Sequence, residues 1–407
     1  MVNRHLEKIC FHEEFGRQMR FISGPRQIGK TTLAKSFLHQ QNFDQLYFNW
    51  DLRAVRDRYI QDPYFFETDI YDTQKHGELA WICLDEIHKM PKWKNILKDY
   101  FDRFEEEARF IVTGSARLEW FQKSGDALTG RYFLFHLLPL TLSEAAGNSM
   151  PQLREGEAAE DFIERQIARV RYEQDLLDQL LNYSGFPEPF IRASHRFFRR
   201  WQKDTTDQII REDVRDMTRI IETENIASLI LRLPVRIGSP LSLNALREDV
   251  QTSYTAVKNA ISALQLTCVI FLIPPYSRNV SRALKKEKKC YFYNWTRCPD
   301  PAVRFENYVA VELKTLIELW NDSGLGLLDL YYVRTKDGRE TDFLITRDGQ
   351  PWCLLEAKLS DDPVESHHRK HAEALGRIPV VRLTQETKVV KKSKEGIFRI
   401  SASRFFS

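Results

Sequence analysis

The chain has 407 residues, a formal net charge of +3 from 60 Lys and Arg against 57 Asp and Glu, and 43% hydrophobic residues. This length predicts two or three domains, and the composition excludes a disordered chain. The balanced charge gives no global basic field, so any nucleic-acid binding depends on local patches.

The longest apolar stretches are far shorter than the roughly 20 residues that span a bilayer. The N-terminus lacks a signal-peptide core. The six Cys are scattered without CxxC pairs, which indicates reduced packing residues. We expect a cytoplasmic protein with no membrane partner.

The strongest motif follows the apolar run 21–23. Gly24, Gly29, Lys30 and Thr31 satisfy the pattern G-x-x-x-x-G-K-[ST]. The glycines let backbone N–H groups surround a phosphate chain. Lys30 then reaches the β/γ oxygens and Thr31 offers its hydroxyl to Mg²⁺, while residues 32–38 are expected to form a helix whose N-terminus faces the same anion. The residues expected to contact the nucleotide here are Gly24, Pro25, Arg26, Gln27, Ile28, Gly29, Lys30, Thr31 and Thr32.

Two further apolar strands are expected over 81–86 and 109–115. The first ends in Asp85, which is predicted to position the metal, and Glu86, which is predicted to activate the attacking water. The second ends in Thr113 and Ser115, and Ser115 is a candidate γ-phosphate sensor. Residues 92–107 have the apolar spacing of an amphipathic helix. Strands that alternate with helices predict a parallel sheet with right-handed crossovers.

The composition becomes polar and acidic after Pro151, which places a domain boundary near residue 150. The pattern from about 160 to 236 is helical. Within it, residues 195–204 carry Arg196, Arg199, Arg200 and Lys203 on a helix, and this set is interpreted either as a phosphate contact or as a solvated basic face.

Residues 241–273 predict helix, turn, helix and strand, the order found in a winged-helix module. Its second helix carries Tyr254, Lys258 and Asn259. Such a module either reads a DNA groove or serves as a protein-interaction or packing domain. The following charge run contains Arg282, Lys285, Lys286, Lys288 and Lys289 and is interpreted as a solvated segment or a contact to a nucleic-acid backbone.

Together these segments resemble a widespread family of prokaryotic AAA+-type ATPases whose C-terminal region resembles a nuclease. The matching segments are 23–33, 83–89, 113–120, 128–144, 182–190, 210–216, 304–313, 340–345 and 354–358. The resemblance implies ATP binding with slow hydrolysis. It also implies an arginine finger or sensor, for which Arg131 and Arg117 are alternatives.

The C-terminal third contains a set of carboxylates. A helix is expected over 305–320, followed by a hairpin of strands 340–346 and 351–358. Asp342, Glu356 and Lys358 on this hairpin resemble the PD-(D/E)xK nuclease core, in which acids bind Mg²⁺ and the lysine stabilises charge at the attacked phosphate. Either Glu306, which is preferred, or Glu312 supplies the helix acid. Residue 341 is Thr where that motif has Pro.

The sequence therefore predicts an α/β protein with three parts: a P-loop NTPase domain (1–150), a helical and winged-helix region (151–280) and a restriction-endonuclease-like domain (281–407). The leading hypothesis is an Mg²⁺-dependent ATPase that acts as a nucleotide-driven switch on a DNA-associated or protein partner, with homo-oligomers as the usual assembly of AAA-type domains. The alternatives are an ATP-gated, metal-dependent nuclease and a nucleotide-sensing scaffold that does not hydrolyse ATP.

Overall fold

A computed structural model describes residues 2–73, 79–114, 128–208, 223–277 and 286–407. The chain divides into two compact units, which we call the N-terminal unit (Arg4–Leu138) and the C-terminal unit (Pro139–Ser407, with the first three residues). The boundary expected near residue 150 therefore falls inside the C-terminal unit. Ser115, Arg117, the segment 210–216 and the basic residues Arg282 and Lys285 lie outside the described residues.

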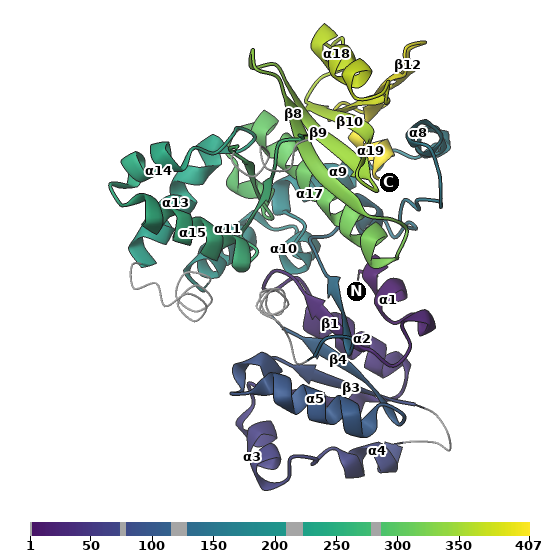
Figure 1. The fold of residues 1–407 in the computed structure, drawn as a ribbon, viewed down its shortest axis with the longest axis vertical. Coiled ribbons are helices and arrows are strands. Elements are labelled where there is room, and N and C mark those ends of the chain that lie inside the picture. Colours follow the sequence, from purple (N-terminus) through teal and green to yellow (C-terminus); the bar gives the residue numbers. More distant parts are fainter. Residues whose placement is uncertain (1, 74–78, 115–127, 209–222, 278–285) are drawn as a thin grey trace. The chain divides into compact units, whose positions relative to one another are not determined.

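The N-terminal unit is built on a five-stranded sheet in the order β2-β3-β4-β1-β5 (Figure 1). Every neighbouring pair in this sheet is parallel, as the alternation of strands and helices predicts. The strands are β1 (Met19–Ser23), β2 (Tyr47–Asn49), β3 (Ala80–Asp85), β4 (Ala108–Thr113) and β5 (Tyr132–His136), and the helices are α1 (His5–Cys10), α2 (Lys30–Gln40), α3 (Arg53–Gln61), α4 (Glu67–Thr73) and α5 (Trp93–Phe104).

Helices α2 and α5 cover opposite faces of this sheet. Phe37 of α2 packs edge-on against Trp81 of β3, with ring centroids 4.9 Å apart. Tyr100 of α5 stacks near Phe110 of β4. Trp81 lies opposite Arg109 in the β3–β4 pairing, and Phe110 is the next residue along β4. The side chains of Trp81 and Phe110 therefore point to opposite faces of the sheet. Because successive side chains of a strand point to opposite faces, the two helices lie on different sides.

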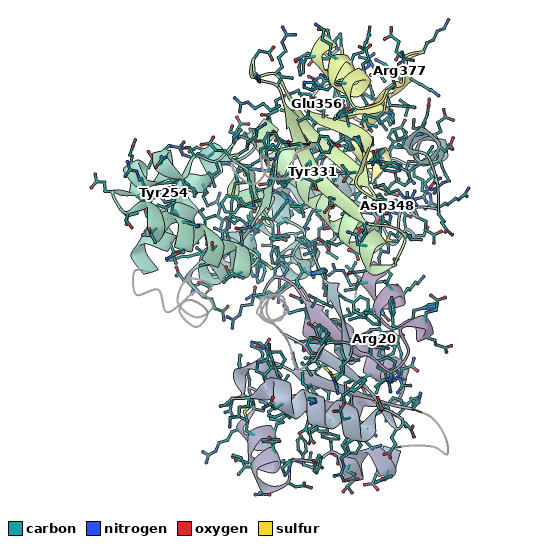
Figure 2. All side chains as sticks on the ribbon, viewed as in Figure 1. Arg20, Tyr254, Tyr331, Asp348, Glu356 and Arg377 are labelled. Atoms are coloured by element: carbon teal, nitrogen blue, oxygen red, sulfur yellow. The ribbon has the colours of Figure 1, made fainter. Side chains whose placement is uncertain are left out.

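A buried arginine attaches the N-terminal segment to the sheet. Arg20 of β1 is 1% exposed, and its guanidinium donates hydrogen bonds to the carbonyls of Cys10, Phe15 and Gly16. Burial lowers the pKa of Arg20 to about 10. Figure 2 shows Arg20 within the N-terminal unit. Arg20 therefore ties the segment before β1 to the sheet.

The first half of the C-terminal unit is helical, as expected. Its helices are α7 (Leu142–Ala145), α8 (Ala159–Ala168), α9 (Gln174–Tyr183), α10 (Pro187–Arg192), α11 (His195–Gln208), α13 (Thr223–Arg232), α14 (Leu243–Val250) and α15 (Tyr254–Leu266). A two-stranded antiparallel sheet of β6 (Ile270–Ile273) and β7 (Lys289–Phe292) follows. Pro240, before α14, forms an antiparallel bridge with Lys289 at the start of β7.

The second half of this unit is a mixed sheet in the order β12-β13-β11-β10-β9-β8. Helix α17 (Pro301–Asp322) precedes it and packs against β8 and β10. The strands are β8 (Leu328–Arg334), β9 (Glu340–Arg347), β10 (Gln350–Lys358), β11 (Val380–Thr384), β12 (Val390–Lys392) and β13 (Ile397–Ser401), with α18 (Ser366–Ala374) before β11 and α19 (Ala402–Phe405) at the end. The expected hairpin is present as β9 and β10, which pair antiparallel with Arg347 opposite Gln350. Strand β11 then joins β10 in parallel.

Within the described ranges, no helix is long and apolar enough to cross a membrane.

Candidate nucleotide site and carboxylate cluster

The phosphate loop, Gly24–Thr31, connects β1 to the N-terminus of α2. Gly24 and Gly29 have φ values of +146° and +100°. A Cβ on Gly24 would lie 2.0 Å from the carbonyl oxygen of Leu137, so only glycine fits there. Gln27 also has a left-handed φ, of 61°. Alternation of this kind turns successive backbone N–H groups toward one side of a loop, where an anion can bind.

Lys30 lies within this loop. It is the first residue of α2, it is 8% exposed, and its ammonium donates hydrogen bonds of 2.8 Å to the carbonyls of Gly24 and Pro25. Two carbonyls of the loop backbone therefore hold the Lys30 ammonium at the loop. Ile28, by contrast, is fully buried, and its carbonyl accepts a hydrogen bond from Arg4. The Ile28 side chain is therefore part of the hydrophobic core, and Ile28 contributes only its backbone to the loop.

Asp85 lies beside the loop at the carboxyl end of β3. Thr31 donates to its Oδ2 over 2.9 Å, Tyr47 donates to the same oxygen, and Thr113 of β4 donates to Oδ1. Thr31 and Asp85, which the sequence assigns separately to the metal, thus lie within hydrogen-bonding distance of each other. Three hydroxyls replace water around a carboxylate that is 2% exposed. Tyr47 is a residue that the sequence did not single out, because it lies on a strand too short to be recognised from its apolar pattern.

Glu86 leaves the strand with a left-handed φ of 61°, and its N–H donates to the carbonyl of Thr113. Its carboxylate lies 3.2 Å from the ammonium of Lys89. Burial raises the pKa of Glu86, while the charge of Lys89 opposes the rise. A carboxylate with a raised pKa beside a phosphate-binding loop is a candidate general base.

Arg131 lies at the amino ends of the strands, whereas the phosphate loop lies at their carboxyl ends. It precedes β5, and its carbonyl accepts from Met19 N at the start of β1, whereas the phosphate loop follows the end of β1. Five residues of parallel strand separate the two ends by about 16 Å. Its guanidinium pairs with Asp102, at 2.7 Å. Within its own chain Arg131 thus lies away from the phosphate loop, and its role as a finger or sensor stays a prediction.

The residues around the loop fit a nucleotide with Mg²⁺. The N-terminus of α2, the loop backbone and Lys30 together provide positive potential for phosphate oxygens. Thr31 and Asp85 offer the hydroxyl and carboxylate oxygens that Mg²⁺ prefers. The metal would supply charge neutralisation at the phosphates.

The second cluster lies in the C-terminal unit, and we call Glu306, Glu340, Asp342 and Glu356 the carboxylate cluster. Glu306 comes from α17, Glu340 and Asp342 from β9, and Glu356 from β10, where Figure 2 labels it. Asp342 Oδ2 accepts from Ala357 N, and Asp342 N donates to Glu356 Oε2. Lys358 lies 2.7 Å from Glu356. The sequence-predicted residues Glu306, Asp342, Glu356 and Lys358 therefore do converge.

The same cluster holds a lysine that was interpreted wrongly. Lys289 was assigned to a solvated or phosphate-contacting run, but its side chain is 0% exposed and its ammonium lies 2.6 Å from Glu340, 3.2 Å from Asp342 and 3.4 Å from Glu306. The run ends in a strand, and the last lysine turns inward because β7 faces α17 and β9. Only a contact between segments distant in sequence shows this, so no local pattern could have found it.

The cluster's acids have divergent proton affinities. Burial, and then the charge of Asp342, raises the pKa of Glu306 to about 7 and that of Glu356 to about 8. Burial acts to raise the pKa of Asp342, but the charges of Lys289 and Lys358 and the hydrogen bond from Ala357 N together outweigh burial and lower that pKa. Asp342 therefore keeps its negative charge to lower pH than Glu306 and Glu356 do.

The middle region presents exposed polar groups on two helices. On α15, Tyr254, Lys258 and Asn259 are exposed, and Figure 2 shows Tyr254 on these helices. On α11, Phe198 and Trp201 are buried. Its basic residues face solvent: Arg196, Arg199, Arg200 and Lys203. A surface hollow is lined by the first three of these and His195.

Glu312, the alternative helix acid, occupies a different place. It is 2% exposed, and its Oε1 accepts hydrogen bonds of 2.7 Å from Leu142 N and from the Tyr308 hydroxyl. It thus anchors the start of α7 to α17. Burial raises the pKa of Glu312 to about 8.

This pKa predicts a pH dependence of stability. Between pH 4.5, the ordinary pKa of a glutamate, and pH 8, the Glu312 carboxyl has lost its proton in the unfolded chain but keeps it in the folded protein, whose pKa is about 8. The contribution of Glu312 to the free energy of unfolding therefore falls as pH rises through that window. Glu312→Gln keeps the acceptor and carries no charge. We expect its free energy of unfolding, relative to wild type, to rise by roughly 1–4 kcal/mol between pH 5 and pH 8. Calorimetric melting at several pH values measures this difference.

Glu373→Gln is the matched control, because Glu373 is exposed on α18. Its melting profile should run parallel to that of wild type. A Glu312→Gln profile that also runs parallel to wild type would show that Glu312 is ionised in the folded protein.

Comparison with known families agrees with the N-terminal geometry. Residues 16–146 match the family model described as an AAA domain. Residues 174–295 and 304–404 match two models described as domains of unknown function, DUF8612 and DUF4143. None of these three models extends over half of the chain.

Two curated relatives are similar over most of the chain. An uncharacterized protein of Mycobacterium tuberculosis is 22% identical over 377 residues, covering 89% of this chain and 74% of that protein. An uncharacterized protein of Methanocaldococcus jannaschii is 23% identical over 332 residues, covering 78% of this chain and 65% of that protein.

Solved structures show only a distant likeness. The AMPPCP-bound DnaA from Aquifex aeolicus is 14% identical, covers 65% of this chain and 88% of its own, and has a TM-score of 0.31. A likeness this low supports no conclusion about site or partner. The phosphate loop, the parallel sheet and the matched family model together identify residues 16–146 as a P-loop domain of the AAA type.

Proposed function

We propose that this protein binds ATP with Mg²⁺ at the phosphate loop and hydrolyses it, as a nucleotide-driven switch on a DNA-associated or protein partner. The observation that carries the proposal is the arrangement around Asp85: Thr31 is hydrogen-bonded to it, and Glu86 follows it at a left-handed turn. A phosphate-binding loop alone supports binding. A metal-positioning acid with a second acid behind it supports turnover.

The division of work among the residues follows from their positions. Lys30 and the loop backbone bind and orient the phosphates. Thr31 and Asp85 hold the metal. Glu86 takes a proton from the attacking water, and burial, which raises its pKa, prepares it to do so.

The first test is nucleotide binding by Lys30→Ala. Loss of a charge-assisted contact to the phosphates is expected to weaken ATP affinity by about 10- to 100-fold. Titration with a fluorescent ATP analogue measures this. The control is Lys98→Ala, which removes an exposed lysine of α5 and should leave the affinity unchanged. Full affinity and turnover in Lys30→Ala would sink the proposal.

The second test separates hydrolysis from binding. Glu86→Gln keeps the shape of the side chain and removes the base, so we expect ATP turnover to fall by about 10²- to 10⁴-fold with affinity unchanged. Glu13→Gln, an exposed acid in the short segment before β1, serves as the control in the same phosphate-release assay. Wild-type protein that binds ATP but shows no single-turnover hydrolysis would favour the non-hydrolysing scaffold.

We also propose that the middle region supplies contact to DNA. The order α13, α14, α15, β6 and β7, with the bridge from Pro240 to Lys289, supports a winged-helix module. Helix α15 offers Tyr254, Lys258 and Asn259 to solvent, and the basic face of α11 belongs to the same unit. A helix with exposed polar groups and a nearby basic face is the combination that groove and backbone contacts require.

The DNA proposal predicts a charge effect at one position. Lys258→Glu is expected to weaken duplex DNA binding by about 10-fold and to lower the slope of log affinity against log salt concentration by about 1. Fluorescence anisotropy with a labelled duplex at several salt concentrations measures both. Lys336→Glu changes an exposed lysine between β8 and β9 and controls for net charge. An equal loss in both variants would place the DNA elsewhere.

A further inference from the structure

The carboxylate cluster is organised around the ammonium of Lys289. This nitrogen lies within hydrogen-bonding distance of Glu340, at 2.6 Å, and Asp342, at 3.2 Å, and 3.4 Å from Glu306. Its side chain is completely buried, and the ring of Tyr332 lies 5.6 Å away on another side. A buried ammonium needs replacement for its water, and here three acids from two elements provide it.

The backbone leaves Lys289 little freedom to withdraw. It begins β7, where it pairs with Ile273 of β6 on one side and forms the bridge with Pro240 on the other. Leu241 N also donates to the carbonyl of Lys288. A residue fixed from both sides of its strand holds its side chain in one direction. The backbone therefore fixes where the side chain begins, and the three ion pairs fix where its ammonium ends.

The oxygens that a metal would use are already engaged. Asp342 Oδ1 faces Lys289, and its Oδ2 accepts from Ala357 N. Glu306 Oε1 accepts from the Tyr291 hydroxyl over 2.7 Å. Gly238 closes over the same carboxylate so tightly that a Cβ there would lie 2.8 Å from both oxygens. These hydrogen bonds fill the space around the acids with protein groups.

The spacing of the acids also disfavours a metal. Among the described residues, the groups whose ligand atoms all lie within 4.8 Å of one another do not include Glu306, Asp342 and Glu356. Mg²⁺ requires oxygens at about 2.1 Å in near-octahedral geometry. An ion bound to Asp342 Oδ1 and Glu306 Oε1 would have to approach the position of the ammonium, where like charges repel at close range. The residues present do not fit a divalent cation while Lys289 is in place.

We propose that the Lys289 ammonium is the resident cation of the carboxylate cluster and that the folded protein holds no divalent metal ion there. The acids that resemble a nuclease core then serve to bind a lysine of the same chain. This proposal is independent of the ATPase, because it concerns residues of the C-terminal unit alone. It removes metal-dependent cleavage from what this cluster does.

The test is a Mn²⁺ titration of the nucleotide-free full chain, with free Mn²⁺ followed by electron paramagnetic resonance. Five proteins are compared: wild type, Asp342→Asn, Lys289→Met, Lys289→Met with Asp342→Asn, and Lys358→Met. The last is the matched control, since Lys358 pairs with Glu356 but is 42% exposed. Wild type and all variants share the phosphate loop, so its contribution cancels.

We expect Lys289→Met to gain one Mn²⁺ site at least about 10-fold tighter than any in wild type, since the metal replaces the missing charge. Adding Asp342→Asn should abolish it, and Lys358→Met should show no comparable gain. Mn²⁺ should also raise the melting temperature of Lys289→Met and leave that of wild type unchanged. If Lys289→Met does not fold alone, refolding in Mn²⁺ is expected to recover it.

Three results would overturn the proposal. The first is a Mn²⁺ site in wild type that Asp342→Asn removes. The second is a Lys289→Met protein that gains no site, or that Mn²⁺ does not help to refold. The third is an equal gain in Lys358→Met, which would mean that net charge, and not the position of Lys289, keeps metal out.

Discussion

Moving an ionised group out of water costs several kcal/mol of hydration free energy unless charges or hydrogen bonds replace its hydration. Both units of this protein are arranged around that requirement. In the N-terminal unit, Asp85 is surrounded by three hydroxyls, Lys30 by two carbonyls and Arg20 by the carbonyls of the entering chain. In the C-terminal unit, Lys289 is surrounded by acids. For Asp85 and Lys289 the partners come from elements far apart in sequence, so these two charges fix how those elements meet. For Lys30 and Arg20 the partners are carbonyls of nearby chain, so these two charges fix a local turn.

The two arrangements differ in what they leave available. Around the phosphate loop, the positive groups are satisfied by backbone carbonyls, which can exchange a weak neutral partner for the stronger one that a phosphate oxygen offers. In the carboxylate cluster, opposite formal charges already satisfy each other, and an incoming ion has to displace a full charge. The N-terminal arrangement is therefore suited to binding a ligand, and the C-terminal one to holding its own chain together.

The sequence predicted the parts of the fold that local spacing determines. The phosphate loop, the acid at the end of β3, the helix after Pro301 and the hairpin of β9 and β10 all follow from patterns within about 20 residues. Strand order and Tyr47 did not follow, because β2 is short and its pairing with β3 is non-local. Lys289 was misjudged for a related reason: its neighbours in the sequence are charged and exposed, and only tertiary structure separates it from them. Likewise, local spacing does not show that Arg131 lies at the end of β1 opposite the phosphate loop, because this depends on the pairing of β1 with β5.

The position of Lys289 has a consequence for how such chains are inherited. The lysine lies in the segment matched by one family model, 174–295, while the acids that neutralise it lie in the segment matched by the next, 304–404. A gene truncated between the two would encode a C-terminal sheet with unneutralised acids in its interior. A recombination event that separates the two segments would likewise leave the buried acids without their lysine. The two segments should therefore recur side by side, in this order, wherever lysine and acids are both kept, and a lineage that loses one should show compensating changes in the other.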